Sequence, residues 1–595
     1  MFTRRQKPSG TGSSNKPFSG TDSKQYSSHF DMVDSPAGSH NGKFAQSRRK
    51  RPRLFWFCVG TLLFLVIAIP ALVCGLYFGL RRHSKSHEVS TVSLVVDLGY
   101  SKYQGAHVEN GVTEWLGIRY AAAPVGDLRF RAPMNPPAND TLHIANKHGP
   151  SCHSSPSTGV DPSKSEDCLF LDVYAPTNSS GSHPVFVFFQ GGGFNSNSNS
   201  NMNANKLING GDHDIVVVTF NYRVGPYGFL SSKEVQADGD LNNGLLDQRK
   251  VLQWVQTNIE QFGGNPNHVT IGGASAGGAS VDLHMSAYNG RDDNLFHAAA
   301  AESQSFGNQL TISESQYQYD GLVKRVNCST STNTLKCLRD TPIQILAANN
   351  IDIPAPGGTG RKGIFMWSPV IDGNFTTNYT YNLFSEGKYV KIPSIFGDST
   401  NEGTVFTPAK INTTAEMHGF LKDNFPKLTE DQLARIDELY PKGEQFPGKG
   451  SYWRTAADVY GEMRYNCPGI YISKAIAGKG EQSWNFRWNV LSPSNAVSGL
   501  GVAHAVTTGS IWGISGAPDN ALTPTIQAYW TSFIRSKDPN TYKLAGAPKW
   551  ETFGTGDGTR VVFPNKVKDV AMESVPQDQR TRCEFLSGIG SSIGQ

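Results

Sequence analysis

Unbroken runs of apolar residues mark several segments of the chain as buried strands. The clearest are "VFVFF" at residues 185–189, "IVVVTF" at 215–220 and the shorter "HVTI" at 268–271. Strands of a parallel sheet are covered by helices on both faces and are apolar throughout. Strands with one solvent-exposed face alternate apolar and polar residues. These runs therefore predict a mostly parallel central sheet flanked by helices.

Between the second and third of these strands, apolar residues recur every three or four positions. Val251, Leu252, Val255, Ile259 and Phe262 would lie on one face of a helix, which "GGNP" then ends. Strand, helix and strand at this spacing form a βαβ unit, for which we expect a right-handed crossover. The predicted fold class is α/β. The second half of the chain has weaker periodicity, and we expect insertions and helices on the same sheet there, without a further domain.

The longest apolar run, Leu54–Leu80, has 27 residues and no charge. About 20 apolar residues span a bilayer as a helix, whereas the apolar part of a signal peptide has roughly 7–15 residues and lies nearer the start. We therefore expect one N-terminal transmembrane helix, a type II signal anchor, in which Pro70 is tolerated as a kink. A late, cleaved signal peptide is the alternative, although no small-residue cleavage site stands out.

The distribution of charge predicts how this helix is oriented. "RRKRPR" at residues 48–53 is a denser basic cluster than the one after the span, which favours a cytoplasmic N-terminus. Residues 1–53 carry 11 Lys/Arg against 3 Asp/Glu and few large apolar side chains, so we expect a disordered basic cytoplasmic tail. Residues 81–91 would be a linker, and residues 92–595 the folded domain. The basic character belongs to the tail, and nothing indicates a nucleic-acid partner.

Cysteine use is typical of an oxidising compartment. Cys58 and Cys74 lie inside the apolar run, where they are apolar filler or candidates for palmitoylation. The other six form an even set, and no CxxC pair favours zinc over disulfides. Pairing of near neighbours gives two bridges and leaves a third as a weaker pair: Cys152–Cys168, Cys328–Cys337 and Cys467–Cys583.

Six N-glycosylation sequons agree with the expected orientation, since all of them follow the apolar run and none precedes it. This placement supports a lumenal or extracellular position for the folded domain, with sugar attached. The predicted acceptors are Asn139, Asn178, Asn327, Asn374, Asn378 and Asn412.

The pentapeptide Gly273–Gly277 fits the pattern G-x-S-x-G, with Ser275 at its centre. A serine hydroxyl is a poor nucleophile near neutral pH and needs a base, a group that orients the base, and donors for the oxyanion. Small neighbours are required because the strand-to-helix turn that exposes such a serine is strained and tightly packed. The strand before it and the helix-compatible "GASVDLHM" after it favour a nucleophile over a flexible Gly/Ala/Ser joint.

Three consecutive glycines, Gly191–Gly193, directly follow the strand at residues 185–189. Without side chains, their N–H groups can approach a substrate oxygen closely. We expect Gly192 and Gly193, together with the N–H of Ala276, to form an oxyanion hole. A flexible loop is the alternative, because "NSNSNSNMNAN" follows.

Several long motifs resemble one known family: "QGGGF", "NYRVGPYGFL", "SEDCLFLDVYAP", "WLGIRYAAAPVGDLRFRAP" and the stretch from Asn242 to Val281 that ends in "GGASAGGASV". Together they resemble the type-B carboxylesterase/lipase family, the cholinesterase-like branch of the α/β-hydrolases, and "AAAESQSFG" resembles its fungal members. The resemblance runs from about Val92 to the C-terminus. It implies an α/β-hydrolase fold and also the two short disulfides named above.

The resemblance implies the remaining members of a catalytic triad. The family's acid is a Glu in a "NEG" turn after a strand, here Glu402, with Asp398 of the same turn as its rival. The family's base is a His after a Gly-containing loop, here His504. We expect His284, on the helix after the serine, to be a packed helix residue. The chain order Ser275, Glu402, His504 is the order that this fold uses.

Two departures from the family bear on the substrate. Ala274 precedes the serine where many members have Glu, and the loop between Cys152 and Cys168 lacks an aromatic side chain that could hold a quaternary ammonium by cation–π attraction. Both departures argue against choline esters. The same loop is too short to form a large lid over the site. This favours an esterase for soluble esters over an interfacially activated lipase.

We therefore expect a membrane-anchored serine hydrolase that cleaves a small, neutral carboxylic ester and needs no metal or organic cofactor. The alternative is a catalytically silent ectodomain that serves adhesion or recognition. Members of that kind typically lack the serine, and all three triad residues are present here. The natural ester, its acyl length and the oligomeric state are left open by the sequence.

Overall fold

The computed structural model describes residues 93–178, 181–197, 201–514 and 521–595, and all of them belong to one compact unit. The predicted tail, the predicted membrane span Leu54–Leu80 and the predicted linker lie outside the described residues. Within the part of the chain that is described, no helix combines the length and the apolar character needed to cross a bilayer.

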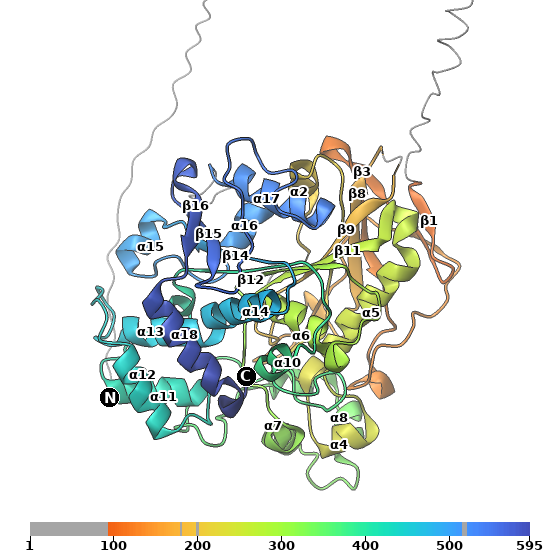
Figure 1. The fold of residues 1–595 in the computed structure, drawn as a ribbon. Helices are drawn as coiled ribbons and strands as arrows, with labels where there is room; N and C mark the ends of the chain where they lie inside the picture. The colour runs from red at the N-terminus through yellow and green to blue at the C-terminus, as the bar shows by residue number, and fades with distance from the viewer. Residues whose placement is uncertain (1–92, 179–180, 198–200, 515–520) are drawn as a thin grey trace, which may run out of the picture. The chain divides into compact units, whose positions relative to one another are not determined.

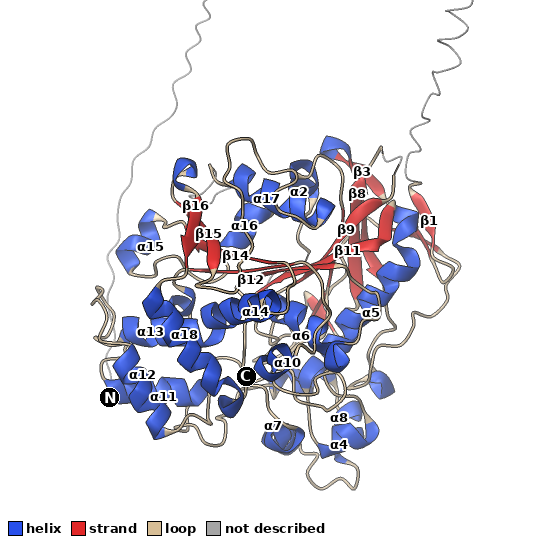
Figure 2. Ribbon diagram, in the orientation of Figure 1, coloured by secondary structure: helices blue, strands red, loops and turns tan. Residues whose placement is uncertain are grey.

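A large twisted sheet runs through the unit (Figures 1 and 2). Its order is β16-β15-β14-β13-β12-β11-β9-β10-β8-β4-β3. The strands from β15 to β10 pair in parallel, and the strands at both edges pair antiparallel. The predicted α/β class with a mostly parallel sheet is confirmed. The bounds are Ala106–Val108 (β3), Val112–Arg119 (β4), Phe170–Pro176 (β8), His183–Phe189 (β9), Val216–Phe220 (β10), Gly264–Ala274 (β11), Ala298–Glu302 (β12), Ser394–Ser399 (β13), Ser483–Asn489 (β14), Thr559–Pro564 (β15) and Ala571–Ser574 (β16).

Strand β9 shows why the central strands are apolar on both faces. Val187 and Phe189 point into one buried cluster, whereas Phe186 and Phe188 point into the other. Successive side chains of a strand point to opposite faces, so a strand between two cores has to be apolar at every position.

Helices cover both faces of the sheet, as Figure 1 shows. The first core is closed by α5 (Asn243–Asn258), α6 (Ala276–Gly290) and α14 (Cys467–Ala477), and the second by α2 (Asn205–Gly210), α16 (Thr507–Ile511) and α17 (Thr523–Ser536). A third, separate cluster lies among α11 (Thr414–Asn424), α12 (Glu430–Leu439), α13 (Trp453–Gly461) and α18 (Gln577–Ile589). The second half of the chain thus adds strands to the sheet and helices around it.

The βαβ unit expected from the sequence is present, with longer elements than the apolar runs indicated. The short run "HVTI" is the middle of β11, and the predicted helix is α5 followed by a 3-10 turn at Ile259–Phe262. Strands β10 and β11 lie on either side of β9, so the connection through α5 crosses over β9. Because β9, β11, β12 and β13 pair in parallel, their carboxyl ends all lie at one edge of the sheet.

Three disulfides join all six cysteines outside the predicted span: Cys152–Cys168, Cys328–Cys337 and Cys467–Cys583. The expectation of disulfides is confirmed, including the third pair, which spacing alone supported weakly. This third bridge ties α14, which packs on the sheet, to α18 near the end of the chain. It closes a loop with a sequence separation of 116, against 9 for Cys328–Cys337.

We expect the long bridge to contribute more stability than the short one. Loop-closure entropy predicts a loss of about 5 kcal/mol for removal of Cys467–Cys583 and about 2.5 kcal/mol for removal of Cys328–Cys337. Urea unfolding of the double variants C467A/C583A and C328A/C337A measures both values. Equal losses would show that loop closure does not control the contribution of these bridges.

Candidate active site

Ser275 occupies the turn between β11 and α6. Its backbone has φ 60° and ψ −124°, a combination that is costly for a residue with a side chain. Two hydrogen bonds hold the turn: the Ser275 N–H donates to the Glu302 carbonyl at 3.0 Å, and the Ala279 N–H donates to the Ser275 carbonyl at 2.9 Å. The strained turn lifts the serine away from the sheet at the start of the helix, as G-x-S-x-G predicts.

The two glycines of the motif are required by close backbone packing. A Cβ on Gly277 would lie 1.9 Å from the carbonyl oxygen of Phe189, and a Cβ on Gly273 would lie 2.3 Å from the carbonyl oxygen of Gly277. Real Cβ atoms do not approach other atoms this closely, so no other residue fits at either position. Helix α6 can therefore start directly against the end of β9, where the glycine loop begins.

The loop after β9 turns back sharply at Gly192 and Gly193, whose φ angles are +116° and +62°. The N–H groups of Asn195 and Ser196 both donate to the Gly192 carbonyl at 3.0 Å, which fixes the turn. Within the described residues, the N–H groups of Gly192, Gly193 and Ala276 donate to no acceptor. Three backbone donors predicted from the sequence are thus free to bind an oxyanion.

Glu402 and His504 are brought together from segments 102 residues apart. Glu402 has no exposed surface, and its Oε2 accepts a hydrogen bond from His504 Nδ1. Its Oε1 accepts from the Ser399 N–H at 2.5 Å and from the Ser303 hydroxyl at 2.7 Å. With its proton on Nδ1, the imidazole presents an unprotonated Nε2, which is the tautomer that a general base needs.

His504 Nε2 is buried and has no hydrogen-bond partner among the described residues. The structure therefore pairs the histidine with Glu402 but contains no hydrogen bond from Ser275 Oγ to Nε2. Hydrogen bonds between nucleophile and base are often long without substrate and tighten in the complex. The Ser275 turn, His504 and Glu402 all lie at the carboxyl edge of the sheet.

Two aromatic rings pack against the imidazole of His504. The ring of Tyr465 lies with its centroid 4.4 Å away, and the ring of Phe406 packs edge-on at 5.0 Å. Burial raises the pKa of the Tyr465 phenol well above its ordinary value, so this neighbour stays neutral. The rings exclude water from one side of the histidine and restrict its rotation. Neither residue was singled out from the sequence.

Ser303 is a further residue of the site that sequence reasoning missed. It directly follows β12, and its hydroxyl donates to Glu402 and accepts from the Ala505 N–H at 3.2 Å. One hydroxyl therefore fixes both the acid and the residue next to the base. In the sequence it lies within "AAAESQSFG", the motif that resembles the fungal members of the family, and it follows a run of alanines. Polar residues after a buried parallel strand lie at the edge where sites form.

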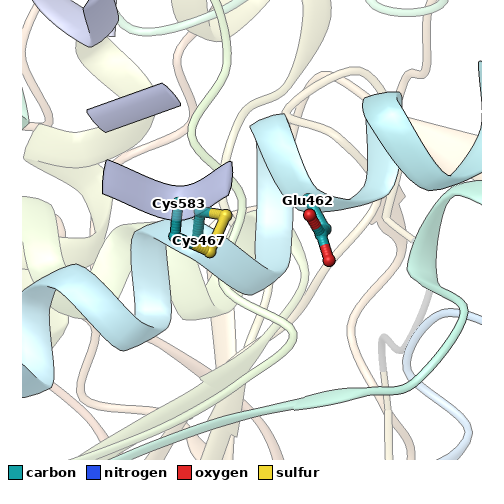
Figure 3. Close-up of side chains that lie close together, drawn as sticks. All are labelled: Glu462, Cys467 and Cys583. Atoms are coloured by element: carbon teal, nitrogen blue, oxygen red, sulfur yellow. A yellow bond between two sulfur atoms is a disulfide. The ribbon is translucent and has the colours of Figure 1, made fainter. Parts of the chain in front are cut away.

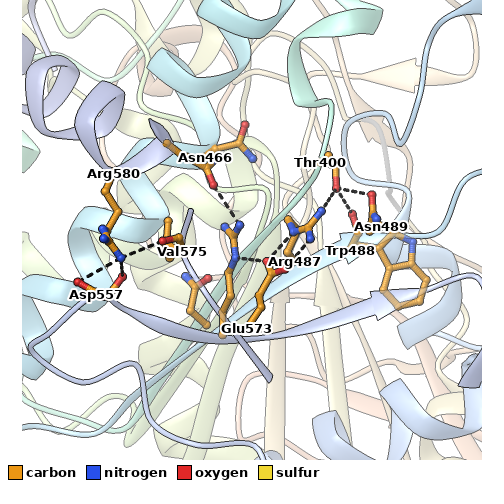
Figure 4. A network of polar contacts seen from close by, with 12 residues as sticks. Thr400, Asn466, Arg487, Trp488, Asn489, Asp557, Glu573, Val575 and Arg580 are labelled. Carbon is orange, nitrogen blue, oxygen red and sulfur yellow. Dashed lines mark hydrogen bonds and ion pairs between the residues drawn. The ribbon is translucent and has the colours of Figure 1, made fainter. Parts of the chain in front are cut away.

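A network of charged side chains supports the turn that carries Glu402 (Figure 4). Arg487 on β14 pairs with Glu573 on β16 through two hydrogen bonds of 2.7 and 2.6 Å, and its remaining nitrogen donates to the Thr400 hydroxyl at 3.3 Å. The Thr400 hydroxyl and N–H both donate to the Trp488 carbonyl, at 3.1 and 3.0 Å. The turn is thereby held to β14 just before the catalytic acid candidate.

Asn401 connects the same turn to the histidine loop. Its N–H donates to the Val502 carbonyl at 2.8 Å, and its side-chain oxygen accepts from the Val502 N–H at 2.9 Å. Val502 lies two residues before His504. The turn with the acid and the loop with the base are therefore joined by backbone contacts as well as by the Glu402–His504 pair.

Asp398, the rival to Glu402, and His284, the expected packed helix residue, have other partners. Asp398 accepts from Gln304 Nε2 at 3.0 Å, and burial and the nearby Glu402 raise its pKa well above the ordinary value. His284 is fully buried, hydrogen-bonds through Nε2 with Gln248 at 3.1 Å and stacks on Phe189, and burial lowers its pKa well below normal. Each is a packed interior residue.

One cluster among the described residues has the composition of a metal site: Glu462, Cys467 and Cys583 (Figure 3). The two sulfurs are bonded to each other, and a metal ligand has to be a thiolate. The carboxylate of Glu462 is engaged by Arg582 through two hydrogen bonds of 2.7 Å and by the Tyr440 hydroxyl at 2.7 Å. The cluster is therefore a structural tie between α14 and α18.

Comparison with known proteins agrees with this geometry. The model of the carboxylesterase family matches residues 93–584. Lipase 2 of Geotrichum candidum is 31% identical over 502 residues, which cover 73% of this chain and 85% of the lipase. Secreted lipase 4 of Gibberella zeae is 29% identical over 501 residues, covering 79% and 89%. The crystal structure of Aspergillus niger EstA superposes with a TM-score of 0.82 at 40% identity and covers 85% of this chain and 99% of EstA.

We expect S303A to lower the turnover of a p-nitrophenyl ester by about tenfold to a hundredfold with little change in KM. A hydrogen bond to a charged group contributes about 1.5–3 kcal/mol, and the loss falls on the orientation of the acid and the base. S286A is the matched control, since Ser286 is buried on α6 and donates to the Asp282 carbonyl at 2.9 Å. A wild-type kcat for S303A would contradict the expected role.

Proposed function

Because the chain belongs to the carboxylesterase family and is a carboxylic ester hydrolase, we propose that it cleaves neutral carboxylic esters through a covalent acyl-enzyme on Ser275. His504 is the general base and Glu402 the residue that orients it. The observation that carries the proposal is the buried Glu402–His504 pair, in which Nδ1 faces the carboxylate and Nε2 has no hydrogen-bond partner among the described residues. That arrangement is what a serine nucleophile requires of its base.

In the first half of the proposed reaction, Ser275 Oγ attacks the ester carbonyl carbon while His504 Nε2 takes the hydroxyl proton. The carbonyl oxygen becomes an oxyanion and accepts hydrogen bonds from the N–H groups of Gly192, Gly193 and Ala276. The tetrahedral intermediate collapses, the proton on Nε2 passes to the leaving alcohol, and the acyl group stays on the serine. Glu402 stabilises the imidazolium that forms between these steps.

In the second half, water takes the place of the alcohol. His504 Nε2 removes a proton from the water, which attacks the acyl carbon and forms a second oxyanion in the same donor set. Collapse releases the carboxylic acid and returns the proton to Ser275. Each step uses side chains and backbone groups of this chain alone.

The surroundings of the serine favour an uncharged substrate. Ala274 adds no charge beside Ser275, and the loop between Cys152 and Cys168 offers no aromatic ring for a quaternary ammonium. We therefore propose neutral carboxylic esters as the substrate class.

The loop between Cys152 and Cys168 is also tied down along its length. The Ser155 hydroxyl donates to Asn350 Oδ1 at 2.7 Å, the Ser157 hydroxyl donates to the Ala347 carbonyl at 2.6 Å, and the half-buried Glu166 forms two 2.7 Å hydrogen bonds with Arg129. A lid that opens at a lipid surface would have to break these contacts. They support an esterase that works on dissolved esters, although the relatives include proteins named lipases.

We further propose that residues 54–80 anchor the enzyme as a type II membrane protein, with the hydrolase domain lumenal or extracellular. Five of the six predicted glycosylation asparagines are exposed, and Asn378 is half-buried. The name of the Gibberella zeae relative, a secreted lipase, and the three disulfides of this chain support an oxidising compartment for the domain.

The first test is S275A against wild type on neutral p-nitrophenyl esters of increasing acyl length and on acetylthiocholine. We expect the variant to lose about 10⁴-fold or more in kcat, and the wild type to prefer the neutral esters. A mass increase of one acyl group on the wild type, mapped to Ser275, would identify the intermediate. Equal turnover by S275A and wild type would exclude Ser275 as the nucleophile, and no turnover by either would favour a silent ectodomain.

The second test uses the full chain in a eukaryotic host. We expect the protein to stay in membranes through alkaline carbonate extraction, to shift on a gel after removal of N-glycans, and to expose only its N-terminal tail to cytoplasmic protease. A chain that starts at residue 88 and follows an unrelated cleavable leader is the control and should be secreted. Release of the protein by carbonate, together with a new N-terminus after residue 80, would identify a cleaved signal peptide.

A further inference from the structure

Glu302, the last residue of β12, lies between two residues with minimal side chains. In the register of the sheet it is level with Ala274 on β11 and with Gly397 on β13. Side chains at the same level of parallel neighbouring strands point to the same face of the sheet. On this face Ala274 adds only a methyl group and the space beside Gly397 is filled by the Phe486 ring, and the Glu302 carboxyl is 1% exposed.

Two hydrogen bonds connect Glu302 to both sides of the site. Its backbone carbonyl accepts the N–H of Ser275 at 3.0 Å, and its side-chain Oε2 accepts the hydroxyl of Thr508 at 3.1 Å. Thr508 lies on α16, four residues after His504. One residue therefore contacts both the turn of the nucleophile and the helix that follows the base, and the proposed mechanism above gives it no role.

We propose that Glu302 is a positioning residue that holds the Ser275 turn and the helix α16, which follows His504, in register as a neutral carboxylic acid, and that its ionisation limits ester hydrolysis at alkaline pH. The inference rests on the proposed triad. It adds to the triad a residue that touches neither substrate nor reacting atoms.

The electrostatic surroundings support a neutral Glu302 at physiological pH. Its pKa is raised to about 8, chiefly by burial and also by the nearby Glu402, while the hydrogen bond from Thr508 acts to lower it. No cation is among the groups that act on it. Above about pH 8 the carboxylate would face Glu402 with a single hydroxyl as its donor. Repulsion between the two carboxylates then acts on the group that orients His504, and turnover falls.

The same shift has a defined sign in stability. The unfolded chain releases this proton near the ordinary value of 4.5, and the folded protein releases it near 8. Between these values the folded state binds more protons, so stability falls as pH rises and levels off above about 8. A variant with an uncharged amide at this position lacks that dependence.

The experiment compares wild type, E302Q, E302A, T508V and D282N in the full-length protein. We expect E302A to lose about tenfold in kcat at pH 7 with KM unchanged, and E302Q to recover to within about threefold of wild type, because the amide oxygen still accepts from Thr508. In kcat against pH, the alkaline limb near pH 8 should be absent in E302Q up to pH 9.5. It should move to higher pH in T508V, because the hydrogen bond that lowers the pKa is gone.

D282N is the matched control. Asp282 is a fully buried carboxyl on α6, its pKa is also raised well above normal by burial, and among the described residues its Oδ2 has no hydrogen-bond partner. Among the described residues no hydrogen bond joins its side chain to Ser275 or Thr508, so we expect D282N to keep the wild-type alkaline limb. As a second measurement, the Tm of E302Q minus that of wild type should grow from pH 5 to pH 8 and then stay constant.

The proposal is overturned if E302Q keeps the wild-type alkaline limb, if D282N removes it, or if E302A turns over as fast as wild type. Should the Glu302 variants fold poorly, T508V tests the proposal on its own. An unchanged alkaline limb in T508V would contradict the proposed dependence of turnover on the ionisation of Glu302. Failure of the triad is a separate outcome: it would appear as activity in S275A, whereas the present proposal can fail while S275A is inactive.

Discussion

A carboxylate with no exposed surface has to find its hydrogen-bond donors inside the protein, and Glu402 obtains them from three separate segments. One is the Ser399 N–H at the end of β13, one is the Ser303 hydroxyl after β12, and one is the imidazole of His504. Leaving any of these out would leave a buried charge poorly solvated, which costs several kcal/mol. The requirement to satisfy this one group therefore fixes where three segments of chain meet.

The meeting point depends in turn on how closely the backbones approach. Gly273 and Gly277 let the strained serine turn sit against the end of β9, and the glycine loop turns away at the same place. Parallel strands bring their carboxyl ends to one edge, so the turn after β11 and the acid turn after β13 lie on either side of β12. Residues 302 and 303, at the end of that central strand, can contact both neighbours. This position explains why Glu302, which ends β12, and Ser303, which follows it, together contact the Ser275 turn, Glu402 and helix α16.

Much of this arrangement could be predicted from the sequence, and the parts that could not share a physical cause. Apolar runs predicted β9 and β10 almost to the residue, because burial on both faces leaves a continuous signal. The apolar run at residues 268–271 predicted only the middle of β11, because glycines and polar residues extend that strand beyond the run. Glu402 and His504 were accessible through family resemblance and not through any local pattern, and their catalytic roles stay predictions.

Ser303 and Glu302 could not be found from the sequence in the same way, and the Cys467–Cys583 pair was only the weaker prediction left after near neighbours were paired. Their importance arises from the register between strands and from contacts across 99 to 206 residues of chain, which no window of sequence contains. The predicted membrane span lies outside the described residues. Spacing is a good guide where partners are neighbours in the chain and a poor one where the sheet brings distant residues together.

The two buried glutamates at this edge differ in what surrounds them, and that difference separates their roles. Glu402 is met by a backbone N–H, a hydroxyl and an imidazole, which together suit a charged acceptor. Glu302 is met by one hydroxyl and by the charge of Glu402 itself. Placing two negative charges side by side in the interior is unfavourable, so an arrangement with one charged and one neutral carboxyl is the stable one. Ala274 and Gly397, the residues level with Glu302 on the neighbouring strands, carry no side-chain donor that could stabilise a second negative charge there.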